Sequence, residues 1–115
     1  MHALIIEDEF LTAQLIEDHL RDLGYTSFSF AMDETEAIAA ASDRCPELIT
    51  SDVQLGSGCG IDAVQCICGA KTIPVLYITA TATMVRDRCP SAVCIQKPFG
   101  TAALREGVRQ ARFVA

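Results

Sequence analysis

The sequence lacks three features that would place it in other classes of protein. No apolar run approaches the roughly 20 residues that a membrane-spanning helix needs, so no membrane partner is expected. The net charge is −6, and no basic patch is present to offset a phosphate backbone, so nucleic acid is not an expected partner either. The N-terminus reaches Glu7 and Asp8 at once, unlike a signal peptide. These absences predict a soluble, cytoplasmic protein.

Paired cysteine spacings are missing too, although the chain has six cysteines. Cys66 and Cys68 are separated by one residue, which differs from the C-x2-C pairs of zinc sites. Thiols at positions i and i+2 of a helix also point to different faces. We therefore predict reduced cysteines without a metal or disulfide role, most of them small buried residues.

The composition is that of one globular domain, residues 1–115, with about half of its residues apolar. No internal repeat, low-complexity tract or linker interrupts it. Short apolar runs alternate with helical patterns five times, which predicts an α/β fold with a parallel sheet. The predicted strands lie near residues 1–6, 25–30, 48–52, 75–78 and 93–96, and the predicted helices near residues 10–23, 35–44, 61–68, 80–88 and 101–113.

Several predicted helices carry recognisable start and stop signals. Gly24 is placed to end the helix of residues 10–23. The acidic stretch of residues 33–36 resembles a capping box. In the last helix, Leu104, Val108 and Phe113 are predicted to turn inward.

Polar side chains stand where four of the predicted strands end. In open parallel α/β sheets, right-handed crossovers bring all carboxyl strand ends to one edge, where ligands bind. We therefore expect the lone aspartate, Asp52, to lie at the centre of a site made of an acidic cluster, a hydroxyl and an ammonium group. The groups in question are Glu7-Asp8-Glu9, Asp52, Thr79 and Lys97.

This set of groups suits a phosphorylatable aspartate with a metal ion. An aspartate can accept a phosphoryl group as an acyl phosphate, and the transfer is stabilised mainly by positioning and charge neutralisation. Clustered carboxylates repel one another unless a cation is present. Mg²⁺ fits, because it takes one or two carboxylates together with waters and phosphoryl oxygens.

Each piece also has an ordinary alternative. Residues 7–9 can be the acidic first turn of a helix, and Asp52 can simply begin a loop. Thr79 can be a strand-end threonine and Lys97 a surface lysine. The order of the pieces within the strand–helix alternation favours the phosphoacceptor over these separate explanations. Two histidines, at positions 2 and 19, are predicted to be exposed and without a catalytic partner.

Taken in order, the motifs resemble the receiver domain of two-component response regulators, and the resemblance covers essentially the whole chain. It rests on Glu7-Asp8, Asp52, Thr79-Ala80 and Lys97-Pro98-Phe99. The loop of residues 54–63 is similar to a variant of alphaproteobacterial receivers. The resemblance implies a doubly wound, flavodoxin-like (βα)5 fold with a five-stranded parallel sheet in the order 2-1-3-4-5.

The resemblance also implies roles for individual residues. Asp52 would be the phosphoacceptor, supplied by a sensor histidine kinase or a histidine phosphotransfer protein, and the downstream partner would be an unknown protein. Asp8, Asp52 and the backbone carbonyl of Gln54 would ligate Mg²⁺, with Glu7 acting through water. No catalysis is implied beyond phosphorylation and dephosphorylation of the chain's own aspartate.

Two further residues would contact the phosphoryl group. Lys97 would pair with Asp52 at rest and with a phosphoryl oxygen afterwards, and Thr79 would donate its hydroxyl to another. The resemblance also implies a cis peptide bond between Lys97 and Pro98.

Two features depart from the family pattern. Receivers usually carry Phe or Tyr three residues before the lysine, and this chain has Cys94 there. The interval from Thr79 to Lys97 is about a helical turn short, which predicts a flexible or truncated fourth helix within residues 80–90. Neither change affects the residues expected to carry out phosphorylation. The way in which receivers usually transmit phosphorylation to a partner is not expected to apply to this chain.

The sequence is compatible with several other functions, and some of them fit its residues better than others. A receiver-like interaction module or phosphate sink would keep the fold without an output switch, and the chain can be a stand-alone receiver or part of a larger protein. A phosphatase of the haloacid dehalogenase type needs a second aspartate where this chain has Gln54. A flavodoxin-like cofactor binder needs a Gly-rich loop where residues 7–10 are mostly acidic.

Overall fold

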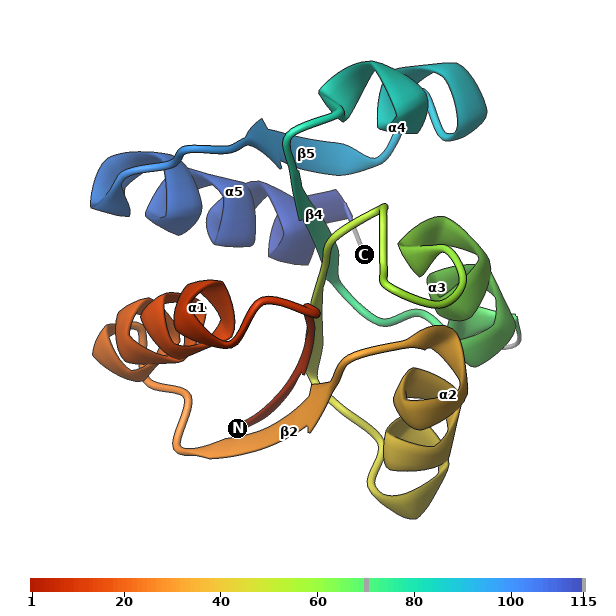
Figure 1. The fold of residues 1–115 in the computed structure, drawn as a ribbon. Coiled ribbons are helices and arrows are strands. Elements are labelled where there is room, and N and C mark those ends of the chain that lie inside the picture. Colours follow the sequence, from red (N-terminus) through yellow and green to blue (C-terminus); the bar gives the residue numbers. More distant parts are fainter. Residues whose placement is uncertain (70, 115) are drawn as a thin grey trace.

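A single parallel sheet of five strands forms the centre of the computed structural model, which describes residues 1–69 and 71–114 (Figure 1). The strand order is β2-β1-β3-β4-β5, which confirms the predicted doubly wound topology. The strands are β1 (His2–Ile6), β2 (Ser27–Ala31), β3 (Leu48–Ser51), β4 (Val75–Thr79) and β5 (Val93–Gln96). The helices are α1 (Phe10–Asp22), α2 (Glu34–Asp43), α3 (Gly60–Cys68), α4 (Ala82–Arg88) and α5 (Thr101–Val114). The predicted domain end at Ala115 lies outside the described residues.

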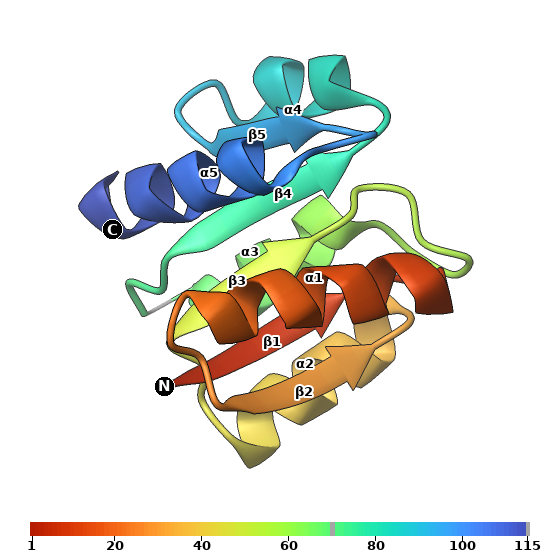
Figure 2. The ribbon, with the colours of Figure 1, turned by 90° about the vertical axis from the view of Figure 1, so that its left-hand side faces the viewer.

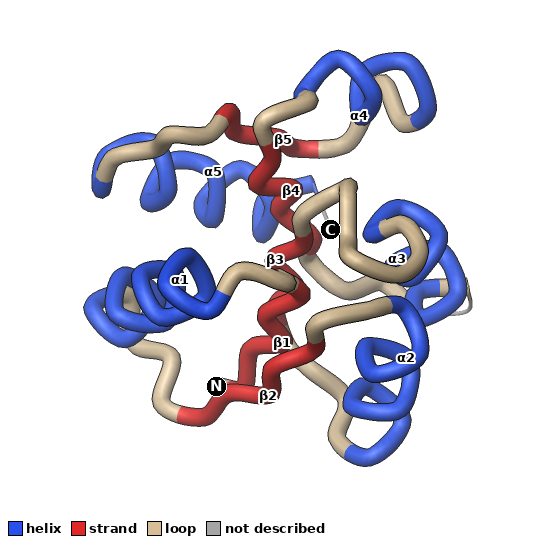
Figure 3. The backbone as a smooth tube through the Cα atoms, in the orientation of Figure 1, coloured by secondary structure: helices blue, strands red, loops and turns tan. Residues whose placement is uncertain are grey.

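The helices cover the two faces of the sheet unequally. Helices α1 and α5 lie on one face, and α2, α3 and α4 lie on the other (Figures 2 and 3). Alternate residues of β1 therefore enter two separate cores, Ala3 and Ile5 on one side and Leu4 and Ile6 on the other. All four are buried, as expected for a central parallel strand that is apolar without alternation.

Local signals place the helix ends where the sequence predicts them. Gly24 adopts a positive φ of 99° and donates its N–H to the Arg21 carbonyl, which ends α1. Asp33 caps α2 by accepting the Glu36 N–H at 2.8 Å. The Glu36 carboxylate accepts the N–H of Met32 rather than that of Asp33, so the capping box extends one residue further back.

Helix α4 is short, with seven residues, in agreement with the prediction of a truncated fourth helix. Its flexibility stays a prediction. None of the helices formed by residues 1–69 and 71–114 combines the length and apolar character that crossing a membrane requires.

The prediction that Phe113 turns inward is wrong, because this side chain is 84% exposed. Leu104 and Val108 are buried as predicted, and Ala111 completes their stripe. Nine residues at about 100° each place Phe113 on the side of the helix opposite Leu104.

The prediction of an exposed His2 is also wrong. The side chain is buried over the edge strand, with Nδ1 2.7 Å from Ser27 Oγ and Nε2 2.8 Å from Ser29 Oγ. A central strand leaves no exposed face, and β2 supplies a hydroxyl to each ring nitrogen. Burial and the nearby Arg44 guanidinium lower the pKa of His2.

All six cysteines are free thiols, and the expectation that most of them are buried is wrong. Cys45 and Cys66 are exposed, and the other four are only partly buried. Their positions explain this, because most lie at helix ends or in loops. Cys59 precedes the first residue of α3, and Cys89 follows the last residue of α4.

Candidate functional site

The carboxyl ends of the central strands are held together by backbone hydrogen bonds that continue past the strands. The Asp52 N–H donates to the Ile6 carbonyl at 3.0 Å, just after β3 ends. The Lys97 N–H donates to the Thr79 carbonyl at 2.9 Å, which ties the end of β5 to the end of β4. The parallel register thus brings residues far apart in sequence to one edge of the sheet.

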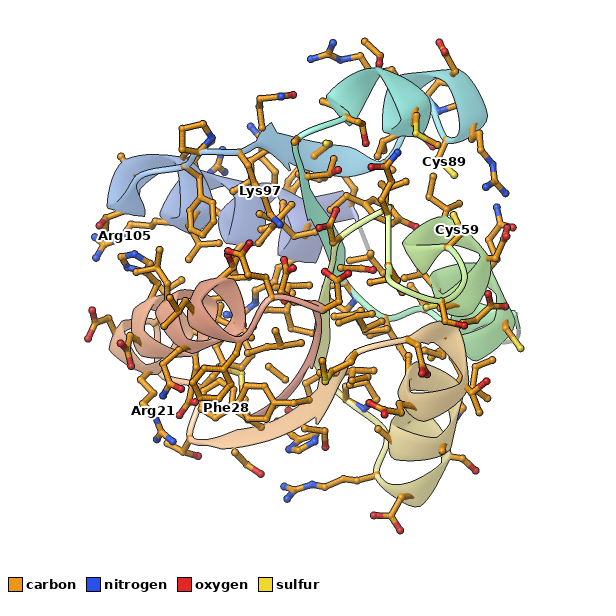
Figure 4. The ribbon with its side chains drawn as sticks, viewed as in Figure 1. Arg21, Phe28, Cys59, Cys89, Lys97 and Arg105 are labelled. Atoms are coloured by element: carbon orange, nitrogen blue, oxygen red, sulfur yellow. The ribbon has the colours of Figure 1, made fainter. Side chains whose placement is uncertain are left out.

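Lys97 bridges two carboxylates at this edge. Its Nζ lies 2.7 Å from Glu7 Oε1 and 2.9 Å from Asp52 Oδ2. Figure 4 shows the Lys97 side chain directed from the end of β5 toward the central strands. The peptide bond between Lys97 and Pro98 is cis, as predicted.

Burial and hydrogen bonding shift the pKa values of Glu7 and Lys97. Burial raises the pKa of Glu7, although the Lys97 hydrogen bond opposes this. Burial would lower the pKa of Lys97, but hydrogen bonds to Glu7 and Asp52 outweigh it and raise that pKa. Lys97 therefore stays charged at neutral pH and offsets the negative charge of both neighbours.

The Asp52 carboxylate is oriented on both of its oxygens. Oδ1 accepts the N–H of the next residue, Val53, at 2.7 Å, and Oδ2 accepts from Lys97. The residue stays only partly buried, so solvent or a reaction partner can reach it. This combination of fixed orientation and access is what a nucleophilic carboxylate requires.

Three carboxylates in the site could hold a metal ion. Glu7, Asp8 and Asp52 each offer an oxygen, and these oxygens lie within 4.8 Å of one another. A hard divalent cation such as Mg²⁺ suits this all-oxygen donor set, so the residues present fit the ion. The exposed Gln54 follows Asp52 by two residues in the loop that leads to α3.

Gly60 fixes the far end of the loop that follows Asp52. Its N–H donates to the Val53 carbonyl at 2.8 Å, which folds the loop back on itself. A Cβ at position 60 would lie 1.7 Å from the Asp52 carbonyl oxygen, so only glycine fits there. From the sequence, Gly60 was recognised only as part of a loop similar to that of alphaproteobacterial receivers. No pattern in the sequence indicated that its backbone lies against the Asp52 carbonyl.

Thr79 is buried at the end of β4 with its hydroxyl already engaged. Oγ1 lies 3.0 Å from Thr81 Oγ1 and also accepts the Thr81 N–H at 3.1 Å. Gln96, which pairs with Thr79 across the strands, donates its side-chain amide to the Ala80 carbonyl at 2.6 Å. These partners of the segment after β4 were not predicted, because Thr81 and Gln96 belong to no motif.

The chain matches the family described as the response regulator receiver domain over residues 3–109. It belongs to this family. The predicted membership is therefore confirmed, and the site described above lies within the matched residues.

The receiver domain is similar to several known proteins of one type. It is 38% identical over 114 residues to the phyllosphere-induced regulator PhyR of Methylorubrum extorquens, covering 96% of this chain and 43% of that protein. The solution structure of the PhyR receiver domain from Erythrobacter litoralis superposes with a TM-score of 0.87 at 36% identity, covering 97% of this chain and 89% of that one.

A third similar structure is a mutant of the anti-anti-sigma factor PhyR from Bartonella quintana. It superposes with a TM-score of 0.89 at 34% identity, covering 98% of this chain and 48% of that one. This receiver domain thus spans about half the length of the full PhyR proteins that it resembles.

Proposed function

We propose that Asp52 accepts a phosphoryl group in the presence of Mg²⁺, and that the phosphorylated domain signals through contacts with another protein. The observation that carries this proposal is the Lys97 ammonium held between Asp52 and Glu7, with Asp8 in the same cluster. The donor is a histidine kinase or a histidine phosphotransfer protein, in keeping with the family.

The transfer follows from the orientation of Asp52. One carboxylate oxygen attacks the phosphorus of a phosphohistidine, the P–N bond breaks, and the electron pair leaves with the imidazole nitrogen. Asp8, Asp52 and the Gln54 backbone carbonyl would hold Mg²⁺, with Glu7 acting through water. When bound, the ion supplies positive charge that offsets repulsion between the carboxylates and the incoming phosphoryl group.

Lys97 and Thr79 act on the product in this proposal. Lys97 exchanges its contact with Asp52 for one with a phosphoryl oxygen. In this partly buried site the attraction between the ammonium and the phosphoryl oxygen is stronger than it would be in water. Thr79 donates its hydroxyl to another phosphoryl oxygen. It can do so beside Thr81, because either hydroxyl can be the donor in the contact between Thr79 Oγ1 and Thr81 Oγ1.

The test is phosphorylation with a small-molecule donor. The wild-type domain and the Asp52→Asn variant are incubated with Mg²⁺ and acetyl phosphate, and the intact mass of each protein is measured by mass spectrometry. A gain of one phosphoryl group in the wild type alone supports the proposal. An unmodified wild type, or equal modification of both proteins, contradicts it.

The similarity to PhyR suggests the setting of this function. The Bartonella quintana protein is called an anti-anti-sigma factor. We propose that this chain provides the phosphorylation-sensing part of a comparable regulator.

A second candidate function is a phosphate sink or a receiver-like interaction module that lacks an output switch. Two observations favour it, namely Cys94 in place of the usual aromatic residue and the seven-residue α4. The same phosphorylation experiment separates the candidates when NMR spectra are recorded alongside it. Phosphorylation without a change in α4 indicates a sink, and Mg²⁺ binding without phosphorylation indicates an interaction module.

A further inference from the structure

A row of large apolar side chains runs along the junction of α1 and the edge strand β2, which we call the α1–β2 seam. Phe28 and Phe30 point to the same side of β2, and their stacked rings lie 6.5 Å apart. Met32 continues the row beyond the strand, and Phe10 faces it from the start of α1. A surface row of this size calls for an explanation, because isolated exposed apolar residues are common but contiguous ones are not.

One end of the seam is covered by the chain itself. The Arg21 guanidinium lies 4.8 Å from the centre of the Phe28 ring, and Figure 4 shows both residues between α1 and β2. The same guanidinium pairs with Glu17, with 2.6 Å between Nη2 and Oε2. The seam thus accommodates a planar cation that stacks on an aromatic ring and pairs with a carboxylate of α1.

The other end of the seam has the same chemistry but is open. A cavity of about 300 Å³ lies between Phe10, Phe30 and Met32, and the acidic residues Glu7, Asp8 and Glu17 also line it. Phe30 is 49% exposed and Met32 is 55% exposed. Among the residues that the structure describes, no Lys or Arg lines this cavity.

The charge of the surrounding chain is strongly one-sided. Residues 1–43 carry ten Asp and Glu against a single Arg, whereas residues 44–115 carry five against eight Lys and Arg. An anionic lipid surface or a nucleic acid would be repelled by this acidic part of the chain. A basic partner would be attracted to it.

We propose that the open end of the α1–β2 seam binds a segment of a partner protein that carries arginine beside an apolar side chain. The partner's guanidinium stacks on Phe30 as Arg21 stacks on Phe28, and it pairs with the acidic residues that line the cavity. The neighbouring apolar side chain enters the cavity against Phe10 and Met32. This surface adjoins the strand-end site, because Glu7 and Asp8 also line the cavity, but its test does not depend on phosphorylation.

The test uses a defined peptide and a probe inside the seam. The protein has three methionines, and their ¹³C-labelled methyl groups give separate NMR signals. The probe ligand is a seven-residue peptide that alternates Arg and Leu, and its twin carries uncharged citrulline in place of Arg. The Met32 signal should shift with the Arg peptide and respond at least tenfold more weakly to the citrulline peptide. The Met84 signal, from α4, should not move.

Two adjacent residues of α1 provide matched variants. Phe10 is 74% exposed and lines the cavity, whereas Leu11 is 76% exposed and does not. Phe10→Ser should weaken binding of the Arg peptide about tenfold, and Leu11→Ser should leave it unchanged. Circular dichroism confirms that both variants are folded, as expected for such exposed positions.

Four outcomes would overturn the proposal. They are an unmoved Met32 signal, equal binding of the two peptides, equal losses in the two variants, and a Met32 shift that follows protein concentration alone. The last would identify a second copy of the domain as the occupant.

Discussion

Cys94 lies directly opposite Tyr77 in the parallel pairing of β4 with β5. Both side chains belong to the core that α2, α3 and α4 cover, with Tyr77 buried and Cys94 packed at its margin. A receiver of the usual pattern carries its large ring at position 94, near the edge of the sheet. In this domain the aromatic ring is that of Tyr77, on the neighbouring strand β4, which lies closer to the centre of the sheet. We therefore expect the packing of this core to depend on Tyr77.

This arrangement predicts unequal costs for the two residues. Tyr77→Ala should lower the free energy of unfolding by about 3–5 kcal/mol, the usual loss for a buried aromatic ring. Cys94→Ala should cost about 1 kcal/mol or less, since it removes one partly exposed atom. Urea unfolding at constant pH measures both values. A greater loss for Cys94→Ala would show that position 94 still anchors the core.

The bridge formed by Lys97 predicts a pH-dependent defect when the ammonium is removed. Lys97→Met leaves the Glu7 carboxylate buried without its partner, which should cost about 2–4 kcal/mol at pH 7. The unpaired carboxylate has a raised pKa, so the folded state takes up a proton as the pH falls. The defect should therefore shrink between pH 7 and pH 5, as measured by urea unfolding.

A double variant provides the control for this prediction. Lys97→Met leaves a buried, unpaired negative charge on Glu7, and Glu7→Gln removes that charge. The double variant should therefore be more stable than Lys97→Met alone at pH 7. If the two losses simply add, Glu7 and Lys97 are not energetically coupled.

The sequence was sufficient to predict which groups meet at the sheet edge, but not how they pair. Alternating apolar runs predict a parallel sheet, and right-handed crossovers bring the ends of its strands, with Asp52 and Lys97, to one edge, whereas the strand order was implied only by the resemblance to receiver domains. The 2.7 Å contact between Lys97 and Glu7 depends on side-chain directions that no pattern encodes. The prediction that Phe113 turns inward was wrong, because the nine residues from Leu104 to Phe113 place the two side chains on opposite sides of the helix.

Close backbone approaches were equally invisible in the sequence. The 1.7 Å separation between a Cβ at position 60 and the Asp52 carbonyl comes from two segments meeting in space. The burial of His2 has a similar origin, because it depends on which strand covers β1.

Gly60→Ala should destabilise the domain and disturb the site together. The added methyl group cannot coexist with the Asp52 carbonyl unless the loop shifts, at a cost of about 1–3 kcal/mol or more. Phosphorylation of Asp52 by acetyl phosphate should slow in the same variant. Gly100→Ala is the matched control, because nothing lies within 4 Å of its added Cβ. Equal effects of the two substitutions would contradict the close approach.

The buried imidazole of His2 predicts a loss of stability in mild acid. Burial and Arg44 lower the folded-state pKa of His2 below its ordinary value near 6.5. The unfolded chain then binds the proton first, so the free energy of unfolding falls as the pH drops through about 6.5 toward the folded-state pKa. Urea unfolding from pH 7.5 to pH 5.5 should show this decrease in the wild type. His2→Gln, which can still bond to Ser27 and Ser29 but does not titrate, should show a flatter profile. Parallel profiles for the two proteins would mean that other groups cause the acid sensitivity.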